Sequence, residues 1–551
     1  MRHFIGLHTT AIEVLLVVAA AAVSFIFVKA SQMASSCVSR LLYRLPRRGW
    51  VAVTLASMLP LVVRTLLLPL WGVPEPVVHD EFGYLLTADT MHSGRLSTPT
   101  HPMWVHFETP NFIQTPTYAS VYTLAQSLFL LVGMYLGHPW AGVALSIALL
   151  CGALCWMLRQ WFSPGWALFG ALLFGIRFGI ASYWMNSYWG GAPAALGAAL
   201  VLGVWGKTLR RRRISPFDGL WLGGGLALLA LSRPYEDLVL VLGIAASWFV
   251  SLHTKRFLGS WVPALLPALA IVFLAGSFFC FCNLRVTGSP FRIPYQVSRQ
   301  QYGIPLVFIW ERSDPGRSAS VQAMKEYYEW LAGLQNRYHS FGGILRSLAG
   351  KISSFFMFYV GPLFCIPLLT VGRVFSGRRL RPLLLAGAIG MFPLLAEAWF
   401  FPHYCAAITP IFIAAIVQAL RYLSTHPRWR TLVPAVPAIA IVMLFITIAA
   451  PNLSRWPISW SAPRTAPGVS RADVQRRLIH SGGRHLVIVR GQSHLNEWVF
   501  NGANIDASTV VWAHDLGPAL NKEIINYYSD RHVWWISLED FPPTLQPITF
   551  H

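Results

Sequence analysis

Residues 259–282 read GSWVPALLPALAIVFLAGSFFCFC, an apolar stretch without a single charged side chain. A helix needs about 20 such residues to cross the hydrocarbon core of a bilayer. Similar stretches recur along the chain, with shorter ones between them: 12–30, 50–71, 352–373 and 431–450. The sequence therefore predicts an all-α polytopic membrane protein with about 11–13 transmembrane helices.

The composition agrees with this fold class. Of the 551 residues, 55% are hydrophobic and only 12% are charged, about half the charged fraction of a soluble domain. The formal net charge of +21 would suggest nucleic acid in a soluble protein. Here the basic residues cluster beside apolar stretches, so the charge indicates topology and attraction to anionic lipid, with no nucleic-acid partner. The seven cysteines show neither zinc spacing nor a disulfide framework.

The basic clusters also predict an orientation. Cytoplasmic ends are assigned to Arg40, Arg44, Arg47, Arg48, Lys207, Arg210 to Arg213, Lys255, Arg256, Arg373, Arg378, Arg379, Arg381, Arg421, Arg428 and Arg430. The loops 72–117 and 283–351, and everything after residue 450, then lie on the extracytoplasmic side. Residues 119–157 resemble two spans, but the charges allow one net crossing there, so we expect one of the two to be short, re-entrant or interfacial.

Three regions are expected. Residues 1–49 hold an extra transmembrane helix, favoured over a signal peptide because no cleavage site is followed by a clear mature start. Residues 50–450 form the transmembrane domain. Residues 451–551 begin as a linker and continue as a small extracytoplasmic α/β domain.

The secondary structure of the polar regions follows from shorter patterns. Apolar runs at 485–489, 509–512 and 533–536, with a helical pattern at 520–528, predict the α/β domain with a core of its own. It lacks a glycine-rich phosphate loop, so nucleotide binding is not expected. A mixed aromatic and charged stretch at 320–338 predicts a surface helix.

The motif with chemical content is His79-Asp80-Glu81-Phe82-Gly83-Tyr84, after the first exported span. Adjacent carboxylates at a membrane surface are costly unless they are used or solvated. Glycosyl transfer needs a base for an acceptor hydroxyl and positive groups for a departing phosphate. An Asp-Glu pair is also an ordinary way to begin a helix.

Four segments together resemble a known family: HDEFGYLLTADTMHSGRLSTPTHPMWVHFETPNFIQTPTYASVYTLAQ (79–126), SYWMNSYWGGAPAALG (182–197), RPYE (233–236) and FPHY (401–404). They resemble bacterial GT-C glycosyltransferases, in the branch of the protein O-mannosyltransferases and aminoarabinose transferases. The likeness spans about residues 50–540. It implies a GT-C fold, a polyprenyl-phosphate sugar donor, and a catalytic Asp80, either as base or as an organiser linked to a divalent metal.

One departure limits the resemblance. Better-known members carry a Lys-Pro-Pro-like motif where this chain has Gln114-Thr115-Pro116-Thr117-Tyr118. The identity of the acceptor is therefore not carried over. Protein, glycolipid and polysaccharide acceptors remain as alternatives.

The candidate site residues fall into three groups. Catalytic candidates are Asp80 and Glu81. Candidates for donor phosphate are Arg233, Arg64, Arg177, His403 and Tyr404. Candidates for other substrate contacts are His79, Tyr84, Tyr188, Trp189 and Glu236.

Each group has an alternative interpretation. Intramembrane arginines also reach headgroups by snorkelling, and interfacial aromatics also form belts. Arg233 and Glu236 are also close enough in sequence for an internal ion pair. The spacing of His79, His101, His106 and Glu108 is irregular, so no metal site is assigned to them, although a divalent metal stays compatible with the reaction.

The expected function is an inverting sugar transfer in the bacterial cytoplasmic (inner) membrane, contributing to glycosylation of the cell envelope. The active face and the C-terminus are expected to be extracytoplasmic. The alternatives are a transporter or flippase for lipid-linked glycans and a non-catalytic assembly protein. Transporters tend to show paired halves, which the sequence lacks, and an assembly role leaves Asp80 and Glu81 without a use.

Overall fold

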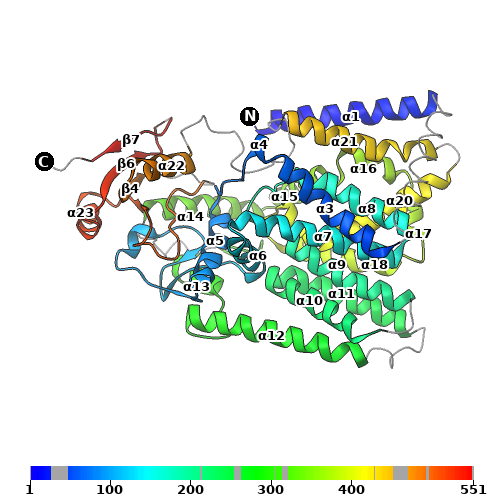
Figure 1. Cartoon of the computed structure of the whole chain (residues 1–551), viewed down its shortest axis with the longest axis horizontal. Coiled ribbons are helices and arrows are strands. Elements are labelled where there is room, and N and C mark those ends of the chain that lie inside the picture. Colours follow the sequence, from blue (N-terminus) through cyan, green and yellow to red (C-terminus); the bar gives the residue numbers. More distant parts are fainter. Residues whose placement is uncertain are drawn as a thin grey trace.

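The computed structural model describes residues 2–26, 48–210, 214–253, 262–303, 306–312, 321–426, 429–450, 470–491, 496–540 and 542–548. Several features expected from the sequence lie outside these ranges: Cys37, the basic residues 40, 44, 47, 211–213, 255, 256 and 428, and the linker at 452–469. The described chain forms a helical bundle with a small mixed domain at one end (Figure 1). This confirms the predicted fold class.

The bundle is built from apolar helices. The longer ones are α1 (Arg2–Ile26), α3 (Gly49–Leu66), α7 (Pro139–Trp161), α9 (Ala192–Arg210), α10 (Pro216–Ser232), α11 (Pro234–His253), α12 (Val262–Thr287), α15 (Phe341–Phe355), α20 (Thr409–Thr425) and α21 (Ala435–Ala449). The shorter ones are α4 (Leu68–Trp71), α6 (Leu124–Tyr135), α8 (Pro164–Phe174), α16 (Gly361–Leu368), α17 (Val371–Ser376), α18 (Arg381–Met391) and α19 (Pro393–Ala396). Among the described residues, seven helical segments are long and apolar enough to cross a membrane, and five shorter apolar helices accompany them.

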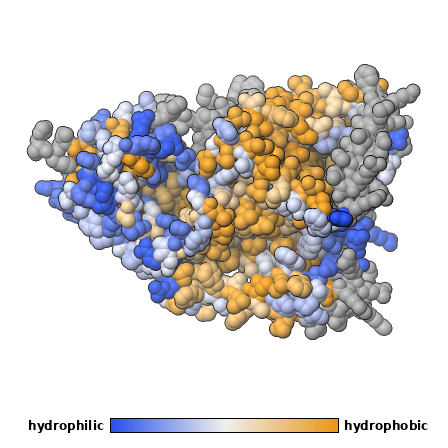
Figure 2. Space-filling model, in the orientation of Figure 1, coloured by the Kyte–Doolittle hydropathy of each residue, from blue (hydrophilic) through white to orange (hydrophobic). Residues whose placement is uncertain are grey.

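Close helix packing depends on small residues. Gly219 and Gly223 of α10 face the backbone of Ala264 and Ala268 of α12, where a β-carbon would meet backbone atoms at 2.2 and 2.8 Å. Such contacts are typical of helices that associate without water. Another side of α12 is exposed and apolar, with Leu266, Leu269 and Phe273 among its exposed residues. In Figure 2 apolar atoms cover most of the bundle; a smaller hydrophilic area lies at its far end, and most hydrophilic atoms gather at the end that carries the mixed domain. We call this end the polar end.

The length of α6 explains why residues 119–157 resemble two spans although the basic residues allow only one net crossing there. α6 has only 12 residues, about 18 Å at 1.5 Å per residue, which is less than the thickness of a hydrocarbon core. It forms a tight hairpin with α7, whose first turn is capped by His138. One of the two expected spans is therefore short, as the charges required.

α1 is integrated into the bundle by a buried carboxylate. Glu13 contacts Arg177 at 3.3 Å and accepts a hydrogen bond of 3.0 Å from the backbone N–H of Leu363. That N–H lies in the first turn of α16, after a break at Gly361, where it has no partner within its own helix. The helix expected near residues 12–30 is therefore a packed member of the bundle over its described part.

The polar end begins with α5 (His79–His92), followed by β1 (Thr98–Pro99), β2 (Phe112–Ile113) and β3 (Thr117–Ser120) in the order β1-β3-β2. It also holds α13 (Pro294–Tyr302) and α14 (Gln322–Gln335), the latter confirming the helix predicted at 320–338. The C-terminal domain contains α22 (Arg471–Ser481), β4 (His485–Arg490), β5 (Val510–His514), α23 (Pro518–Tyr527), β6 (His532–Ser537) and β7 (Leu545–Pro547). Its sheet has the order β5-β4-β6-β7, parallel except for β7.

The C-terminal domain shares its core with the loop after α4, contrary to the separate core expected from the sequence. On one side of the sheet, Val474 and Leu478 of α22 pack on Val487 and Trp512. On the other side, the strands pack against residues of the loop and α5: Phe82, Leu86, Phe107, Phe112 and Tyr118. The loop and α5 complete the cover of this second side, so the loop and the C-terminal domain form one folded unit.

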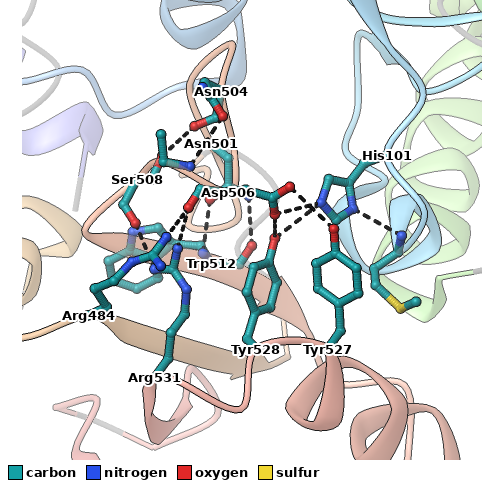
Figure 3. A network of polar contacts seen from close by, with 12 residues as sticks. His101, Arg484, Asn501, Asn504, Asp506, Ser508, Trp512, Tyr527, Tyr528 and Arg531 are labelled. Atoms are coloured by element: carbon teal, nitrogen blue, oxygen red, sulfur yellow. Dashed lines mark hydrogen bonds and ion pairs between the residues drawn. The ribbon is translucent and has the colours of Figure 1, made fainter.

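Polar contacts fix the same interface (Figure 3). Asp506 accepts hydrogen bonds from Tyr528 at 2.7 Å and from His101 at 3.0 Å, and Arg531 donates to its carbonyl oxygen at 2.7 Å. His106 contacts the carbonyl oxygen of His514 at 3.1 Å. His101 and His106 are therefore structural in this unit.

Candidate active site

A cavity of about 510 Å³ lies at the polar end of the bundle. Residues from six parts of the chain line it: 78–124, Trp189, 232–236, 279–295 together with 306–307, 327–331 of α14, and 397–404. Most of the lining is aromatic or aliphatic, which is typical of a ligand site with a few placed polar groups. Within the described lining, the ionisable acids, bases and arginines are His79, Asp80, Arg233, Glu236, Glu397 and His403.

Asp80 stands at the first turn of α5 with one oxygen occupied. Its Oδ1 atom lies 3.0 Å from Nε2 of His79 and accepts a short hydrogen bond from the hydroxyl of Tyr122. Asn111 makes a longer contact of 3.5 Å with the same oxygen. No described residue hydrogen-bonds to Oδ2, so this oxygen remains available to a ligand.

Electrostatics keep Asp80 ionised. Burial opposes ionisation, but the attraction and hydrogen bond of His79 and the hydrogen bond of Tyr122 lower the pKa of Asp80 below its ordinary value. Burial likewise opposes charge on His79, yet Asp80 and Glu497 raise the pKa of His79 above its ordinary value. Burial raises the pKa of Tyr122, so this hydroxyl stays protonated and donates.

Glu81 has a different position from its neighbour. It is fully buried and its two oxygens accept backbone N–H groups, from Val77 and Val78 at 2.9 and 3.2 Å and from Tyr188 at 3.1 Å. Burial raises the pKa of Glu81 to about 7 in spite of these bonds. Glu81 does not line the cavity, so we reassign it from catalysis to fixing the start of α5.

Arg233 provides the cationic group of the cavity. Its guanidinium lies over the ring of Tyr404, 3.6 Å from the centroid, and its Nε atom donates to Glu236 at 2.6 Å. The ion pair with Glu236 is therefore observed, and Arg233 lines the same cavity as His403 and Tyr404. Stacking on a ring leaves the N–H donors at the edge of a guanidinium free for further acceptors.

Tyr183 and Trp189 fix the position of His403. The hydroxyl of Tyr183 lies 3.0 Å from Nδ1 of His403 and accepts the backbone N–H of His403 at 3.0 Å. Trp189 packs on the His403 ring at 4.8 Å. His403, Trp189, Tyr84 and Tyr404 all line the cavity, as expected from the sequence.

Two predicted arginines and one tyrosine lie elsewhere. Arg64 is buried, donates to Asn186 at 2.6 Å and to the carbonyl of Gly72 at 2.7 Å, and lies over the ring of Trp140. Arg177 contacts Glu13. Tyr188 donates its hydroxyl to the carbonyl of Pro74 at 2.8 Å. None of the three lines the cavity, so we remove them from the candidate site.

The sequence did not point to Glu397. It is 3% exposed, lines the cavity, and its Oε1 atom is buried without a hydrogen-bond partner in the described chain. Burial and the nearby Glu236 raise the pKa of Glu397 to about 9, so it is protonated at neutral pH. Its backbone is fixed by Lys351, which donates to the carbonyl oxygen at 2.6 Å. Glu397 therefore brings a neutral carboxyl group to the wall beside Arg233.

The fit of a divalent metal can be tested on the same geometry. Among the described residues, no three His, Cys, Asp or Glu side chains are grouped as ligands. His79 and Asp80 form only a pair. A bound cation at this pair would need further ligands from water and a substrate phosphate, as Mg²⁺ often has. The steps of the reaction are therefore assigned to residues of the protein alone.

The fold and the cavity thus define a polytopic membrane protein with an aromatic pocket that contains an ionised aspartate and a stacked arginine. Comparison with protein-family models and with curated proteins gave no match. Among solved structures, the chain is similar to the oligosaccharyltransferase of Archaeoglobus fulgidus in complex with zinc and sulfate, with a TM-score of 0.49 and 14% identity over 88% of this chain and 67% of that chain.

Two further structures are similar. One is ArnT from Cupriavidus metallidurans bound to undecaprenyl phosphate, with a TM-score of 0.49 and 14% identity over 89% of this chain and 93% of that chain. The other is AglB from Archaeoglobus fulgidus with an inhibitory peptide and a dolichol-phosphate, with a TM-score of 0.47 and 13% identity over 88% and 69%. The likeness to these three structures, all below 25% identity, is one of fold.

Proposed function

We propose that this protein is a membrane glycosyltransferase that moves a sugar from a polyprenyl-phosphate carrier to an acceptor hydroxyl at the extracytoplasmic face. One observation carries the proposal. The available Oδ2 oxygen of ionised Asp80 and the stacked guanidinium of Arg233 line the same largely apolar cavity at the polar end of a membrane bundle.

Asp80 is the proposed general base. Removing the proton of the acceptor hydroxyl makes its oxygen a better nucleophile toward the anomeric carbon. Three donors converge on Oδ1, so Oδ2 takes the proton. A single carboxylate base without a covalent sugar intermediate gives inversion at the anomeric carbon.

Arg233 is the proposed partner of the departing phosphate. A phosphate oxygen accepts charge-assisted hydrogen bonds from a guanidinium, and Tyr404 fixes the plane of this one. Glu236 partly neutralises Arg233 before the donor arrives. The protonated carboxyl of Glu397 and the ring of His403 supply further polar contacts in the same wall.

The lining beside α12 suits a prenyl chain. Phe279 and Cys282 of α12, Leu124 of α6 and Met91 of α5 face one another in an apolar cluster at the cavity. These side chains offer no hydrogen bonds, so burial of hydrocarbon drives binding there.

The positions of the basic residues support the proposed orientation of the protein in the membrane. α9 begins next to the cavity and ends at Arg210 after 19 residues, about 28 Å away. Arg210 donates there to the carbonyl of Arg159, and the charges of Arg379 and Arg421 lie close by. Basic residues favour the cytoplasmic side, which supports an extracytoplasmic position for the cavity and the C-terminal domain.

The test is turnover by the purified full chain in detergent or nanodiscs, offered a panel of undecaprenyl-phosphate monosaccharides. We expect release of undecaprenyl phosphate from at least one of them. Asp80→Asn should fold and bind undecaprenyl phosphate but lose turnover by about a hundredfold or more, and Arg233→Ala should weaken binding. Asp530→Asn, an exposed carboxylate in the C-terminal domain, is the matched control. Full turnover by Asp80→Asn would refute the proposed base.

A further inference from the structure

Residues 109–112 form a β-turn at the edge of the cavity. The backbone N–H of Phe112 donates to the carbonyl of Thr109 at 3.3 Å, with Pro110 and Asn111 at the two central positions. Asn111 has a φ of 65°, and of the described residues other than glycine it alone has a positive φ. Proline followed by a residue of positive φ is the pattern of a type II turn, which favours glycine or asparagine at the second central position. The turn therefore explains a glycine or an asparagine at position 111 but does not choose between them.

The side chain of Asn111 is placed in the cavity, next to the proposed base. It is 5% exposed, lines the cavity, and its amide nitrogen lies 3.5 Å from Oδ1 of Asp80. This distance is at the long end for a hydrogen bond, so the contact is weaker than the bond from Tyr122 to the same oxygen. A glycine at position 111 would satisfy the turn but would leave Oδ1 without this donor. The contact with Asp80 therefore distinguishes asparagine from glycine.

The same β-hairpin brings Asn111 and Tyr122 to Asp80. β2 and β3 pair as antiparallel strands, and beyond their ends the N–H of Val121 donates to the carbonyl of Asn111 at 3.1 Å. Asn111 precedes β2 and Tyr122 follows β3, so both side chains reach Oδ1 of Asp80 from the open end of the hairpin. The hairpin therefore carries two of the three donors on this oxygen and fixes their separation.

We propose that Asn111 is a positioning residue, kept in a left-handed backbone conformation so that its amide holds Oδ1 of Asp80 and leaves Oδ2 for the acceptor. The inference rests on the proposed function, because it takes Asp80 as the base. Backbone conformations that are unfavourable for a residue with a side chain are typical of groups arranged for function. Removing the side chain of Asn111 should therefore lower the rate of the reaction without lowering the stability of the protein.

The main test is Asn111→Gly in the full chain, with Asn336→Gly as the matched control. Glycine adopts a positive φ without steric cost, so Tm should stay near or above the wild-type value. kcat should fall roughly three- to tenfold, the effect of one ordinary hydrogen bond, while undecaprenyl phosphate binding persists. Asn336 is exposed at the end of α14, with a helical φ of −58°, so Asn336→Gly should keep wild-type kcat.

Two results of this comparison would overturn the inference. One is wild-type kcat in Asn111→Gly. The other is a parallel loss of kcat, undecaprenyl phosphate binding and Tm, which would mean a structural role alone. If Asn111→Gly does not fold, Asn111→Asp takes its place, because aspartate also tolerates a positive φ. It replaces the donor by a second carboxylate, so kcat should again fall, and wild-type kcat in this variant would count against the inference.

The pH profile of kcat gives a readout that a purely structural role would not move. A donor to a carboxylate lowers its pKa, so the acidic limb of the profile should move to higher pH in Asn111→Gly, by about half a unit to one unit. It should move further in Asn111→Asp, and an unmoved limb in both variants would overturn the inference. The other titratable groups that act on Asp80 are unchanged in both variants: His79, Tyr84, Tyr122, Tyr327, His403 and Tyr404.

A further measurement separates this inference from the proposed function. If the wild-type chain turns over no donor, the proposed function fails. The pKa of the Asp80 carboxyl still reports on the contact, and carbon NMR of the full chain with labelled aspartate measures it, with Asp80→Asn for assignment. This pKa should be higher in Asn111→Gly than in wild type and unchanged in Asn336→Gly. An equal pKa in wild type and Asn111→Gly would overturn the positioning role.

Discussion

A β-carbon on Gly83 would lie 2.6 Å from Cδ2 of Tyr122, so position 83 must lack a side chain for the two segments to approach this closely. The approach brings the hydroxyl of Tyr122 to Oδ1 of Asp80. Gly83 of the HDEFGY motif thus allows the hydrogen bond from Tyr122 to Asp80, three residues before it.

Gly83→Ala is therefore expected to displace Tyr122. Loss of one hydrogen bond to a charged group costs about 1.5–3 kcal/mol, so kcat should fall roughly tenfold or more. Undecaprenyl phosphate binding should persist. Steady-state kinetics measure the effect, and Gly333→Ala on α14, where a β-carbon meets nothing within 4 Å, is the control. Wild-type kcat in Gly83→Ala would show that Tyr122 does not support Asp80.

Glu81→Gln should act on stability. An amide has one acceptor oxygen, whereas Glu81 uses both of its oxygens for backbone N–H groups. At least one buried N–H then loses its partner, which costs about 1–3 kcal/mol. Thermal unfolding should show a lower Tm, while the folded fraction still binds undecaprenyl phosphate. Glu329→Gln, at an exposed position of α14, is the control. An unchanged Tm with lost turnover would return Glu81 to the catalytic role.

His514 should make the stability of the C-terminal unit depend on pH. Burial lowers the pKa of His514 from its ordinary 6.5 to about 4, and its Nε2 atom is buried without a hydrogen-bond partner in the described chain. Between these values the unfolded chain binds a proton that the folded chain does not, so stability falls as pH falls from 6.5 toward 4. The contribution is about 3 kcal/mol. The fall in Tm between pH 7 and 4.5 should be smaller in His514→Gln, and an equal fall would contradict the assignment.

Deletion of residues 455–551 should not leave a well-behaved membrane domain. The deletion exposes an apolar surface formed by Phe82, Leu86, Phe107, Phe112 and Tyr118. Uncovered apolar surfaces of this kind promote association, so size-exclusion chromatography should show aggregation. A monodisperse truncated protein would mean that the loop folds without the sheet.

Much of the fold was predictable because the sequence patterns that indicate it are local. They do not depend on contacts between residues far apart in the chain. Apolar stretches marked the bundle, and short apolar runs located β4, β5 and β6 within a residue or two. The shared core was not predictable. Phe107, Phe112 and Tyr118 lie between apolar stretches, where aromatic residues also form interfacial belts.

The residues of the candidate site that belong to the quoted sequence motifs could be predicted from the sequence. His79, Asp80, Arg233 and His403 line one cavity although up to 324 positions separate them in the chain. Arg64 was assigned to phosphate because its partner Asn186 lies 122 residues away and could not be identified from the sequence. Glu397 gave no signal, because a lone acid in an apolar run indicates nothing about the side chains around it.

The contact of Glu13 has a consequence for how the protein is made. Its partners on α16 and next to α8 are synthesised later, Leu363 being 350 positions further along the chain. Until they emerge from the ribosome, α1 carries an acid into the membrane without these two partners, which is costly in lipid. α1 therefore acquires the place it has in the folded bundle only after α16 has been made, and a nascent chain arrested before that point would lack the hydrogen bond from Leu363.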